Sequence, residues 1–498
     1  MPSPETHIFD VFIIGAGISG IGCACHLARE LPEKTWAILE AREDLGGTWD
    51  LFKYPGIRSD SDLHTFSYGF KPWASPNAIA SAGEIMSYLR DAADEYGVSD
   101  KINYRHQVVS ADWDSHTGLW TLGVQGPCGL IQAKCRWVFS ATGYYDYEAA
   151  FRPEFSGESS FEGDVIHPQF WPENYEYAGK RIAIIGSGAT AVTLLPAMAS
   201  EAAHVTQIQR TPAYIYPLPK QDGLAKVLKS FLTPKQAHAV VRWKNTRLQR
   251  YFYLFCQRFP KPARRLIRKA NAKRLPKNYP IDTHFNPPYN PWDQRLCAAP
   301  DGDFFEAIRR GRASIMTGDI DEFEAKGVRM KSGELVIADT VVVATGLKLK
   351  MLGGIPLAVD GELVDVPSCL VFRGMMLSDV PNFAFAVGYT NSSWTLKVDI
   401  LCKYLCKLMS AMDDQRKTTC VAKAPAATQE TRPLLDFAAG YVRRSIKELP
   451  KQGADYPWEM TLDYMADLKS LRNRSVLDPA LTLSTAEVTN HLIGAEAA

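Results

Sequence analysis

The sequence lacks the segments that would direct it into or across a membrane. No stretch reaches the roughly 18 uncharged apolar residues that a membrane-spanning helix requires. The first residues, MPSPETHIFDVFIIGAG, lack a basic start followed by an apolar run and a small-residue cleavage site, so they predict no secretory signal. The net charge is +1, so the chain as a whole shows no bias toward nucleic acid or acidic partners. We therefore expect a cytoplasmic protein.

Cysteine is present but lacks a functional spacing. The ten cysteines include no Cys-x-x-Cys pair, so we predict neither a redox-active disulfide nor a bound metal. Cys402 and Cys406 lie four residues apart, which is typical of one face of a core helix. With 498 residues the chain is too long for a single core, so we expect two to four domains.

A glycine-rich turn occupies residues 10–30. Val11 to Ile14 predicts a buried parallel strand, and Ile21 to Glu30 predicts a helix. Three glycines lie between them. Gly15 permits a tight turn, Gly17 lets the backbone approach a pyrophosphate, and Gly20 lets the helix pack close to the strand. The next predicted strand, TWAILE, ends at Glu40, whose carboxylate can accept hydrogen bonds from a ribose. This order predicts a dinucleotide site.

A second such turn follows the predicted strand Arg181 to Ile185. Its small and phosphate-facing residues are Gly186, Gly188, Ala189 and Thr190, with Ala191 in the packing position. The following strand, HVTQIQ, leads to Arg210 and Thr211 and carries no terminal carboxylate. Because arginine pairs bidentately with a 2′-phosphate, this unit predicts NADPH rather than NADH. The alternative is that Arg210 is only a solvated strand end.

Two further strands each run into Ala-Thr-Gly, at residues 141–143 and 344–346. Small residues at a strand end let the chain pass close to a cofactor as it crosses between domains. One tripeptide follows each dinucleotide unit, so both units are predicted to share this arrangement.

Two longer motifs carry a family resemblance. FEGDVIHPQFWP fits FxGxxxHxxxW(P/D) at Phe161, Gly163, His167, Trp171 and Pro172, and GGTWDLFKYPGIRSD fits GGxWxxxxYPGxxxD from Gly46 to Asp60. With the two dinucleotide units, these motifs resemble the Baeyer–Villiger monooxygenases, which are class B flavoprotein monooxygenases. The chain is similar to their ethionamide monooxygenase subgroup in the runs YPGIRSDSD, HPQFWPE, GSGATAVTL, RWKN, YNPWDQRLC and VGYTNSSWTLK.

The resemblance implies an α/β fold with two Rossmann-like dinucleotide-binding domains, for FAD and NADPH, and a helical insertion. The expected order is FAD domain, NADPH domain, insertion, NADPH domain and FAD domain, at residues 1–147, 148–218, 219–295, 296–345 and 346–498. His167 and Trp171 would lie in the linker that couples the motion of the two domains.

The resemblance also implies a reaction. NADPH would reduce FAD, O2 would give a C4a-peroxyflavin, and this species would convert ketones to esters or lactones, with sulfides or thioamides as further substrates. In the family an arginine in the segment resembling PWDQRLC stabilises the developing negative charge, which points to Arg295. Asp60 would orient that guanidinium, with Asp62 as a nearby competitor. Further cofactor-binding residues implied are Gly47, Thr48, Trp49, Asp60, Thr345 and Asn391.

Other functions stay open at this point. A flavin monooxygenase that oxidises nitrogen or sulfur is the nearest alternative, although that group typically has tyrosine where this chain has Trp171. A flavin-binding regulator without turnover is a second alternative. A disulfide reductase is disfavoured because it would need a redox cysteine pair.

The segment 219–295 is strongly basic. Lysines and arginines recur from Lys226 to Lys277 with Asp222 as the only nearby acid, and VVRWKNTRLQRYFYLFCQRF has helical spacing with one apolar face. The first interpretation is a helix whose apolar face packs inward and whose basic face is solvated. The second is an amphipathic helix on a membrane surface. Nucleic-acid binding is not predicted, because nothing else in the chain resembles a nucleic-acid-recognition motif.

Overall fold

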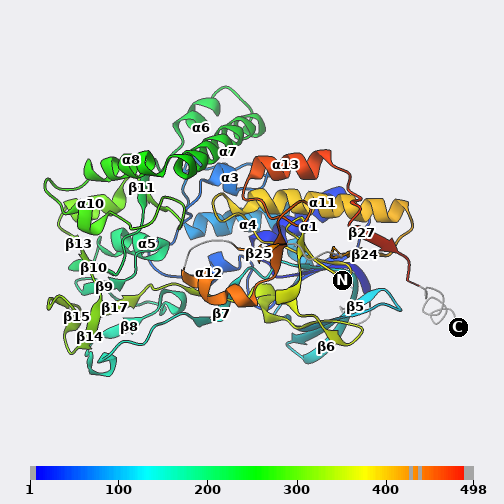
Figure 1. Ribbon diagram of the computed structural model, residues 1–498, viewed down its shortest axis with the longest axis horizontal. Coiled ribbons are helices and arrows are strands. Elements are labelled where there is room, and N and C mark those ends of the chain that lie inside the picture. Colours follow the sequence, from blue (N-terminus) through cyan, green and yellow to red (C-terminus); the bar gives the residue numbers. More distant parts are fainter. Residues whose placement is uncertain (1–6, 426–429, 436–439, 487–498) are drawn as a thin grey trace.

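The computed structural model describes residues 7–425, 430–435 and 440–486, and in these it has two sheets with helices around them (Figure 1). The five-stranded sheet lies at one end of the molecule and the nine-stranded sheet toward the other. Within the described residues, no helix has the length and apolar character needed to cross a membrane.

The nine-stranded sheet has the order β20-β19-β4-β5-β6-β1-β2-β3, and β23 also pairs with β6. Its strands are β1 (Ile8–Ile14), β2 (Trp36–Glu40), β3 (Ile102–Tyr104), β4 (Gln107–Asp114), β5 (Leu119–Gly126), β6 (Gly129–Ser140), β19 (Leu357–Val359), β20 (Glu362–Leu363) and β23 (Phe383–Phe385). Strands β3, β2, β1, β6 and β23 are parallel, and β4–β5–β6 is an antiparallel meander. Alternate residues enter two cores, one of which includes residues of α1 (Ile18–Glu30), α4 (Ala82–Glu95) and α11 (Trp394–Asp414).

The five-stranded sheet is parallel throughout, in the order β13-β10-β9-β17-β8. Its strands are β8 (Asp164–Ile166), β9 (Arg181–Ile185), β10 (His204–Gln209), β13 (Ala313–Thr317) and β17 (Thr340–Val343). The helices α5 (Ala189–Met198) and α10 (Asp303–Arg309) pack on one face, and the hairpin sheet β14 (Ile320–Glu324), β15 (Gly327–Met330) and β16 (Leu335–Ile337) packs on the other. The predicted α/β class with two dinucleotide-binding sheets is confirmed.

The chain crosses between the sheets twice, and the two crossings pair with each other. β7 (Tyr145–Ala150) leaves the nine-stranded sheet and β18 (Leu347–Leu349) returns to it, and these strands run antiparallel. A helical insertion begins after β11 (Ile215–Leu218), which follows the five-stranded sheet's β10 in the chain. It ends at β12 (Cys297–Pro300), which pairs in parallel with β11. The predicted domain boundaries stay predictions.

The insertion consists of α6 (Gly223–Leu228), α7 (Pro234–Arg258), α8 (Pro260–Ala272) and α9 (Ile281–His284). The remaining named helices and strands are short, except for the ten-residue α13. They are α2 (Thr48–Leu51), α3 (Leu63–Phe66), α12 (Gly440–Ser445), α13 (Tyr464–Asn473), β21 (Val371–Phe372), β22 (Met376–Leu377), β24 (Thr419–Ala422), β25 (Thr431–Pro433), β26 (Lys451–Gly453) and β27 (Leu481–Ser484).

The first interpretation of the basic segment describes α7 only in part, because the inner face of this helix mixes apolar and polar side chains. The inner face of this helix carries polar side chains: Asn245 Nδ2 donates to Asp62 Oδ1 at 2.9 Å, and Arg242 Nη2 donates to Asp399 Oδ2 at 3.1 Å. Trp243 and Tyr251 are exposed, whereas Val241 and Cys256 are buried and Phe252 and Tyr253 are half-buried. Polar contacts and apolar packing thus share the inward-facing positions, and part of the apolar surface of α7 is exposed. In contrast, Cys402 and Cys406 are both buried on α11, as predicted.

A glycine in the FxGxxxHxxxWP motif is required by close packing. A Cβ on Gly163 would lie 2.4 Å from the carbonyl oxygen of Asp339 and 2.7 Å from the ring of Phe161. Both atoms belong to well-packed structure, so neither can move without cost.

We therefore expect Gly163→Ala to lower the free energy of unfolding by about 1–3 kcal/mol, because added atoms in a packed site force backbone shifts. Thermal denaturation followed by circular dichroism measures the effect. Gly83→Ala in α4 is the matched control, because a Cβ there meets nothing within 4 Å and alanine favours the helix. Equal melting temperatures for the two variants would contradict the packing argument.

Candidate active site

The two glycine turns have the same backbone hydrogen bonds. In the first, the amide of Gly15 donates to Leu39 O and the amide of Ala141 donates to Ile14 O, both at 2.8 Å. In the second, Gly186 donates to Ile208 O and Ala344 donates to Ile185 O, again at 2.8 Å. Each Ala-Thr-Gly segment is thereby fixed against the turn of its own sheet.

These contacts explain why the first position of each turn is glycine. Gly15 has φ +101°, and a Cβ there would lie 2.9 Å from Ala141 O. Gly186 has φ +143°, and a Cβ would lie 2.3 Å from Ala344 O. The third glycine of the first turn, Gly20, would bring a Cβ to 1.9 Å from Gly15 O, which agrees with its predicted role in helix packing.

Each turn leads into a helix whose first amides lack a side-chain cap. Gly17 is the N-cap of α1 and Gly188 is the N-cap of α5, and neither position offers a capping side chain. The space beside Gly188 is open, since a Cβ there meets nothing within 4 Å. Uncapped amides at a helix N-terminus favour a phosphate group.

A cavity of about 520 Å³ lies along the first turn. It runs past the end of β2, the N-terminus of α1 and the segment after β6. Its wall includes the ion pair of Arg295 and Asp60. Among its lining residues are Gly15, Gly17, Glu40, Arg42, Gly47, Thr48, Trp49, Asp60, Thr142, Gly143, Arg295, Ser392 and Trp394. An uncapped helix N-terminus in an elongated cavity with aromatic walls fits a dinucleotide such as FAD.

The carboxylate of Glu40 is held at the edge of this cavity. Its Oε2 accepts from the amide of Ala16 at 2.6 Å, and its Oε1 accepts from the amide of Arg42 at 2.9 Å. Burial raises the pKa of Glu40, although these two amides favour the charged form. The side chain is thus oriented before any ligand binds, and its contact with a ribose stays a prediction.

The structure distinguishes between the two candidate aspartates. Arg295 Nη1 donates to Asp60 Oδ2 at 3.1 Å, and both side chains line the cavity while remaining about one-third exposed. Asp62 is instead the N-cap of α3, accepts from the amides of His64 and Thr65, and also accepts from Gln249. Asp60 is therefore the carboxylate that can orient Arg295.

The first half of the GGTWDLFKYPGIRSD motif lines the cavity. Gly47 has φ +57°, and Thr48 Oγ1 lies 3.1 Å from the hydroxyl of Tyr147. The ring of Trp49 meets Phe66 edge to face at 5.7 Å between centroids. These contacts fix the residues that the sequence predicted to hold the cofactor.

The second half of the motif contacts the five-stranded unit. The hydroxyl of Tyr54 interacts with Thr190, and burial raises the pKa of Tyr54 to about 12. A Cβ on Gly56 would lie 2.5 Å from Cβ of Ala197, and Arg58 forms an ion pair with Asp303. One short segment thus connects the cavity to α5, the helix whose N-terminus carries Ala189.

The predicted linker residues lie where the chain crosses between sheets. Burial lowers the pKa of the His167 imidazole, and the nearby backbone of Phe151 and Gly346, one on each crossing, opposes this shift. Thr345 Oγ1 donates to Phe151 O at 3.2 Å, so it too joins the crossings. Trp171 packs partly buried against the core of the five-stranded sheet. Arg210 is exposed and Thr211 half-buried directly after β10.

Comparison with known proteins identifies the family. The chain is 45% identical over 477 residues to the FAD-containing monooxygenase EthA of Mycobacterium tuberculosis, and the match covers 96% of this chain and 98% of that protein. The chain belongs to the FAD-containing monooxygenases. A family model for an NAD(P)-binding Rossmann-like domain also matches residues 13–80.

Solved structures share the fold of this FAD-containing monooxygenase at low identity. Oxidized steroid monooxygenase bound to NADP superposes with a TM-score of 0.74 at 18% identity, covering 96% of this chain and all of that one (100%). Cyclohexanone monooxygenase bound to ε-caprolactone superposes with a TM-score of 0.72 at 19% identity and the same coverage. The architecture of the monooxygenase is therefore that of these enzymes.

Most of the predicted FAD-site residues of the monooxygenase line the cavity, but Gly20, Thr345 and Asn391 do not. The Nδ2 of Asn391 instead donates to Leu462 O at 2.9 Å, and Asn391 lines a smaller pocket of about 240 Å³ next to α7. The sequence reading missed cavity residues that follow Ala141-Thr142-Gly143 directly, among them Tyr145 and Tyr147. Their position after that tripeptide was the signal that could have found them.

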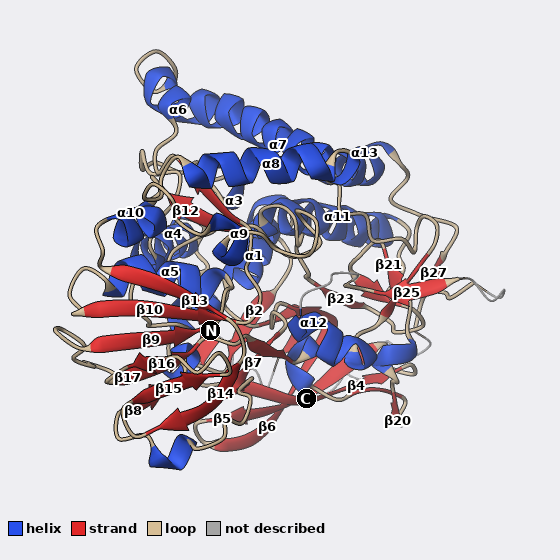
Figure 2. Ribbon diagram, turned by 60° about the vertical axis from the view of Figure 1, so that its left-hand side comes forward, coloured by secondary structure: helices blue, strands red, loops and turns tan. Residues whose placement is uncertain are grey.

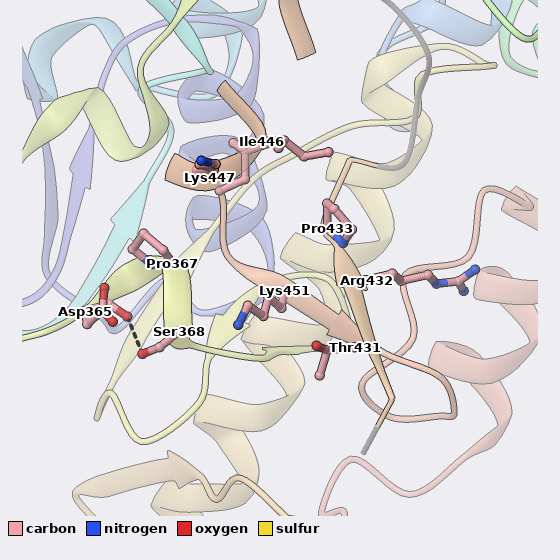
Figure 3. A pocket seen from close by; sticks show the side chains of 10 residues that line it. Asp365, Pro367, Ser368, Thr431, Arg432, Pro433, Ile446, Lys447 and Lys451 are labelled. Atoms are coloured by element: carbon pink, nitrogen blue, oxygen red, sulfur yellow. Dashed lines mark hydrogen bonds between the residues drawn. The ribbon is translucent and has the colours of Figure 1, made fainter. Parts of the chain in front are cut away.

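A separate groove of about 360 Å³ lies between the segments around Ser368 and Lys451 (Figure 3). Its side chains point in several directions, and the hydroxyl of Ser368 is bonded to the carbonyl of Asp365 at 2.7 Å. None of the predicted site residues is among the described residues that line it. We assign no function to this groove.

The two aspartates give a matched test of this geometry. We expect Asp62→Ala to lower the stability by about 1–3 kcal/mol, because it removes the cap of α3 and leaves Asn245 and Gln249 without their acceptor. We expect Asp60→Ala to change stability by about 1 kcal/mol or less, because a part-exposed ion pair contributes little. Thermal melts of the two FAD-loaded variants decide between them. If Asp60→Ala lowered the stability as much as Asp62→Ala, Asp60 would be needed for the stability of the fold.

Proposed function

We propose that this FAD- and NADPH-dependent monooxygenase carries out Baeyer–Villiger oxidation, converting ketones to esters or lactones with O2. Sulfides and thioamides are further substrates of the same site. The observation that carries the proposal is the Arg295–Asp60 pair in the wall of the dinucleotide cavity. Its fold relatives include a cyclohexanone monooxygenase with a bound lactone, which is the product type expected from a cyclic ketone.

FAD, once reduced by NADPH, supplies the activation of O2. The protein supplies a fixed positive charge, because the guanidinium of Arg295 stays protonated at any working pH. In a cavity that restricts water, such a charge stabilises the negative oxygen that forms when a ketone carbonyl is attacked. Stabilisation of this charge is the part of the reaction that we assign to Arg295.

Asp60 is a positioning residue in this proposal. Its carboxylate accepts from Nη1 of Arg295 at 3.1 Å, and both side chains line the cavity. A charged hydrogen bond of this kind restricts the rotamers of a long side chain. It also moderates the positive charge, so the site attracts an anion without being permanently neutralised.

NADPH is assigned to the second turn. Gly188 offers open space at an uncapped helix N-terminus, and Arg210 is exposed at the end of the next strand. A pyrophosphate suits the first feature and a 2′-phosphate suits the second. Tyr54 and Gly56 carry any shift of α5 to the segment that ends in Asp60.

We expect Arg295→Ala to bind FAD but to lose ester formation by at least about 100-fold, because it removes the charge that stabilises the tetrahedral oxyanion. Ester produced from an aryl or aliphatic ketone is measured by mass spectrometry, and FAD content is measured from the flavin absorbance. Arg295→Lys keeps a charge without the bidentate fork, so it should retain part of the activity.

Two results would overturn the assignment. Near-normal ester formation in Arg295→Ala would show that this charge is not needed. A wild-type enzyme that oxidises sulfides or amines while leaving every ketone unchanged would favour a monooxygenase of nitrogen or sulfur.

His167 is proposed to couple the two nucleotide units. We expect His167→Ala to reduce the flavin about tenfold more slowly, or to form less ester per NADPH consumed, because it loses contact with both chain crossings. Anaerobic stopped-flow mixing with NADPH and product counting measure these two quantities.

His167→Asn is the matched variant. His167 Nδ1 accepts from the amide of Gln169 at 3.1 Å, and asparagine can replace that acceptor without reaching Phe151 and Gly346. If both variants reduce the flavin more slowly or form less ester per NADPH, the effect comes from the loss of the side chain beside the two crossings. Wild-type rates and coupling in both would remove His167 from the mechanism.

A further inference from the structure

The outer surface of the insertion gathers exposed apolar side chains that no described part of the chain covers. We call it the insertion face. Its apolar members are Leu224, Val227, Phe231, Val240, Trp243, Leu248, Tyr251, Leu254, Phe259 and Leu266. The other large exposed apolar residues that the structure describes are scattered over the molecule: Ile8, Val109, Leu130, Phe170, Ile337 and Leu363. Many large exposed apolar side chains on one segment are typical of an interaction surface.

On α7 the apolar residues form one stripe. Val240, Trp243, Tyr251 and Leu254 recur at helical spacing on the face opposite the buried Val241 and Asn245. Trp243 is 58% exposed and Tyr251 is 61% exposed. Because water surrounds an indole and a phenol at this position, covering the stripe would be favourable.

The same face is basic and has no acidic residue between Gly223 and Ile281. Some of its cations are tied to the protein, as in Arg250 with Asp463 and Arg268 with Asp282. Others on α8 are exposed and have no ion-pair partner within the described part of the chain: Lys261, Arg265, Lys269 and Lys273. A surface with aromatic and basic side chains together is complementary to an anionic lipid interface.

Two cations of the insertion face lie over its rings. The guanidinium of Arg247 lies 4.1 Å from the ring centre of Trp243, and that of Arg258 lies 5.7 Å from that of Phe259. In a membrane interface, such rings occupy the headgroup level while the neighbouring cations meet phosphate groups. This arrangement suits a layered lipid surface better than a water-filled groove.

The insertion face lies on the outside of the molecule. In both views α6, α7 and α8 run along one edge, away from the two sheets (Figures 1 and 2). In Figure 1 α8 lies to the left of α7 along this edge, and the two helices contact each other.

We propose that the insertion face docks the enzyme on a membrane surface that contains anionic lipids. The contact is peripheral: α7 lies in the interface with its aromatic stripe among the headgroups, and the lysines and arginines of α8 bind lipid phosphates. The inference does not depend on the proposed reaction.

Docking would place a pocket close to the lipid. The inner side of α7 contributes Thr246, Gln249 and Tyr253 to the pocket of about 240 Å³, and Ser392 lines both this pocket and the main cavity. One helix diameter, about 10 Å, separates the two sides of α7. An apolar substrate dissolved in the membrane would therefore be near the active site, a consequence that does rest on the proposed function.

The test uses the complete FAD-loaded enzyme and sedimentation with two kinds of vesicle. We expect the enzyme to sediment with phosphatidylcholine vesicles that contain about 30% phosphatidylglycerol, and far less with pure phosphatidylcholine, because its charge complements the anionic lipid. Raising the salt to about 0.5 M should release it. Binding to neither kind of vesicle would overturn the proposal.

Matched variants locate the contact. Trp243→Ala with Tyr251→Ala should weaken binding about tenfold by removing the aromatic stripe, and Lys261→Glu with Arg265→Glu should weaken it at least as much by reversing charge. Phe170→Ala with Leu363→Ala removes exposed apolar side chains elsewhere and should leave binding unchanged. Flavin content and melting temperature verify that each variant is folded.

A second copy of the chain is the competing occupant of this face. If the face forms a dimer, size-exclusion chromatography without lipid will show a dimer that Trp243→Ala with Tyr251→Ala converts to a monomer, and vesicles will not bind the wild type. That result, or equal vesicle binding by all three double variants, would refute the membrane contact.

Discussion

The rest of the structure depends on one kind of contact, which each nucleotide unit makes once. In this contact a backbone carbonyl lies close to the first glycine of the turn. Ala141 O lies against Gly15 and Ala344 O lies against Gly186. Each contact fixes the glycine turn, and with it the helix N-terminus that faces a phosphate. It also fixes the point where the chain leaves its sheet. The two crossings begin at these points, which is why they can meet and pair as β7 and β18.

Because the crossings pair, side chains from both crossings meet where the chain passes between the two units. His167 lies near the backbone of both crossings, and Thr345 Oγ1 donates to Phe151 O across them. The segment from Tyr54 to Asp60 makes a second connection, since Tyr54 contacts Thr190 while Asp60 holds Arg295. These two connections join the five-stranded unit to the segment that presents the charged pair in the cavity.

The sequence predicted what depends on local order and left open what depends on distant contacts. The strands ending at Ile14, Glu40 and Ile185 follow from short apolar runs beside glycine turns, and the structure has them at those residues. The Asp60–Arg295 contact joins residues 235 positions apart, so only the family resemblance could suggest it. Helical spacing on α7 predicted an apolar face correctly but could not tell which face the protein would bury.

The polar residues on the inner side of α7 link the insertion to the site. Arg242 donates to the backbone carbonyls of His64, Thr65 and Ser67 at the end of α3, and Asn245 donates to Asp62 at its start. Since Asp62 lies two residues after Asp60, the helix that carries the exposed aromatic stripe also holds the segment that presents the partner of Arg295. Apolar side chains at these positions would provide no directional contact with that segment, so the polar residues on the inner side of α7 couple the insertion to the active site.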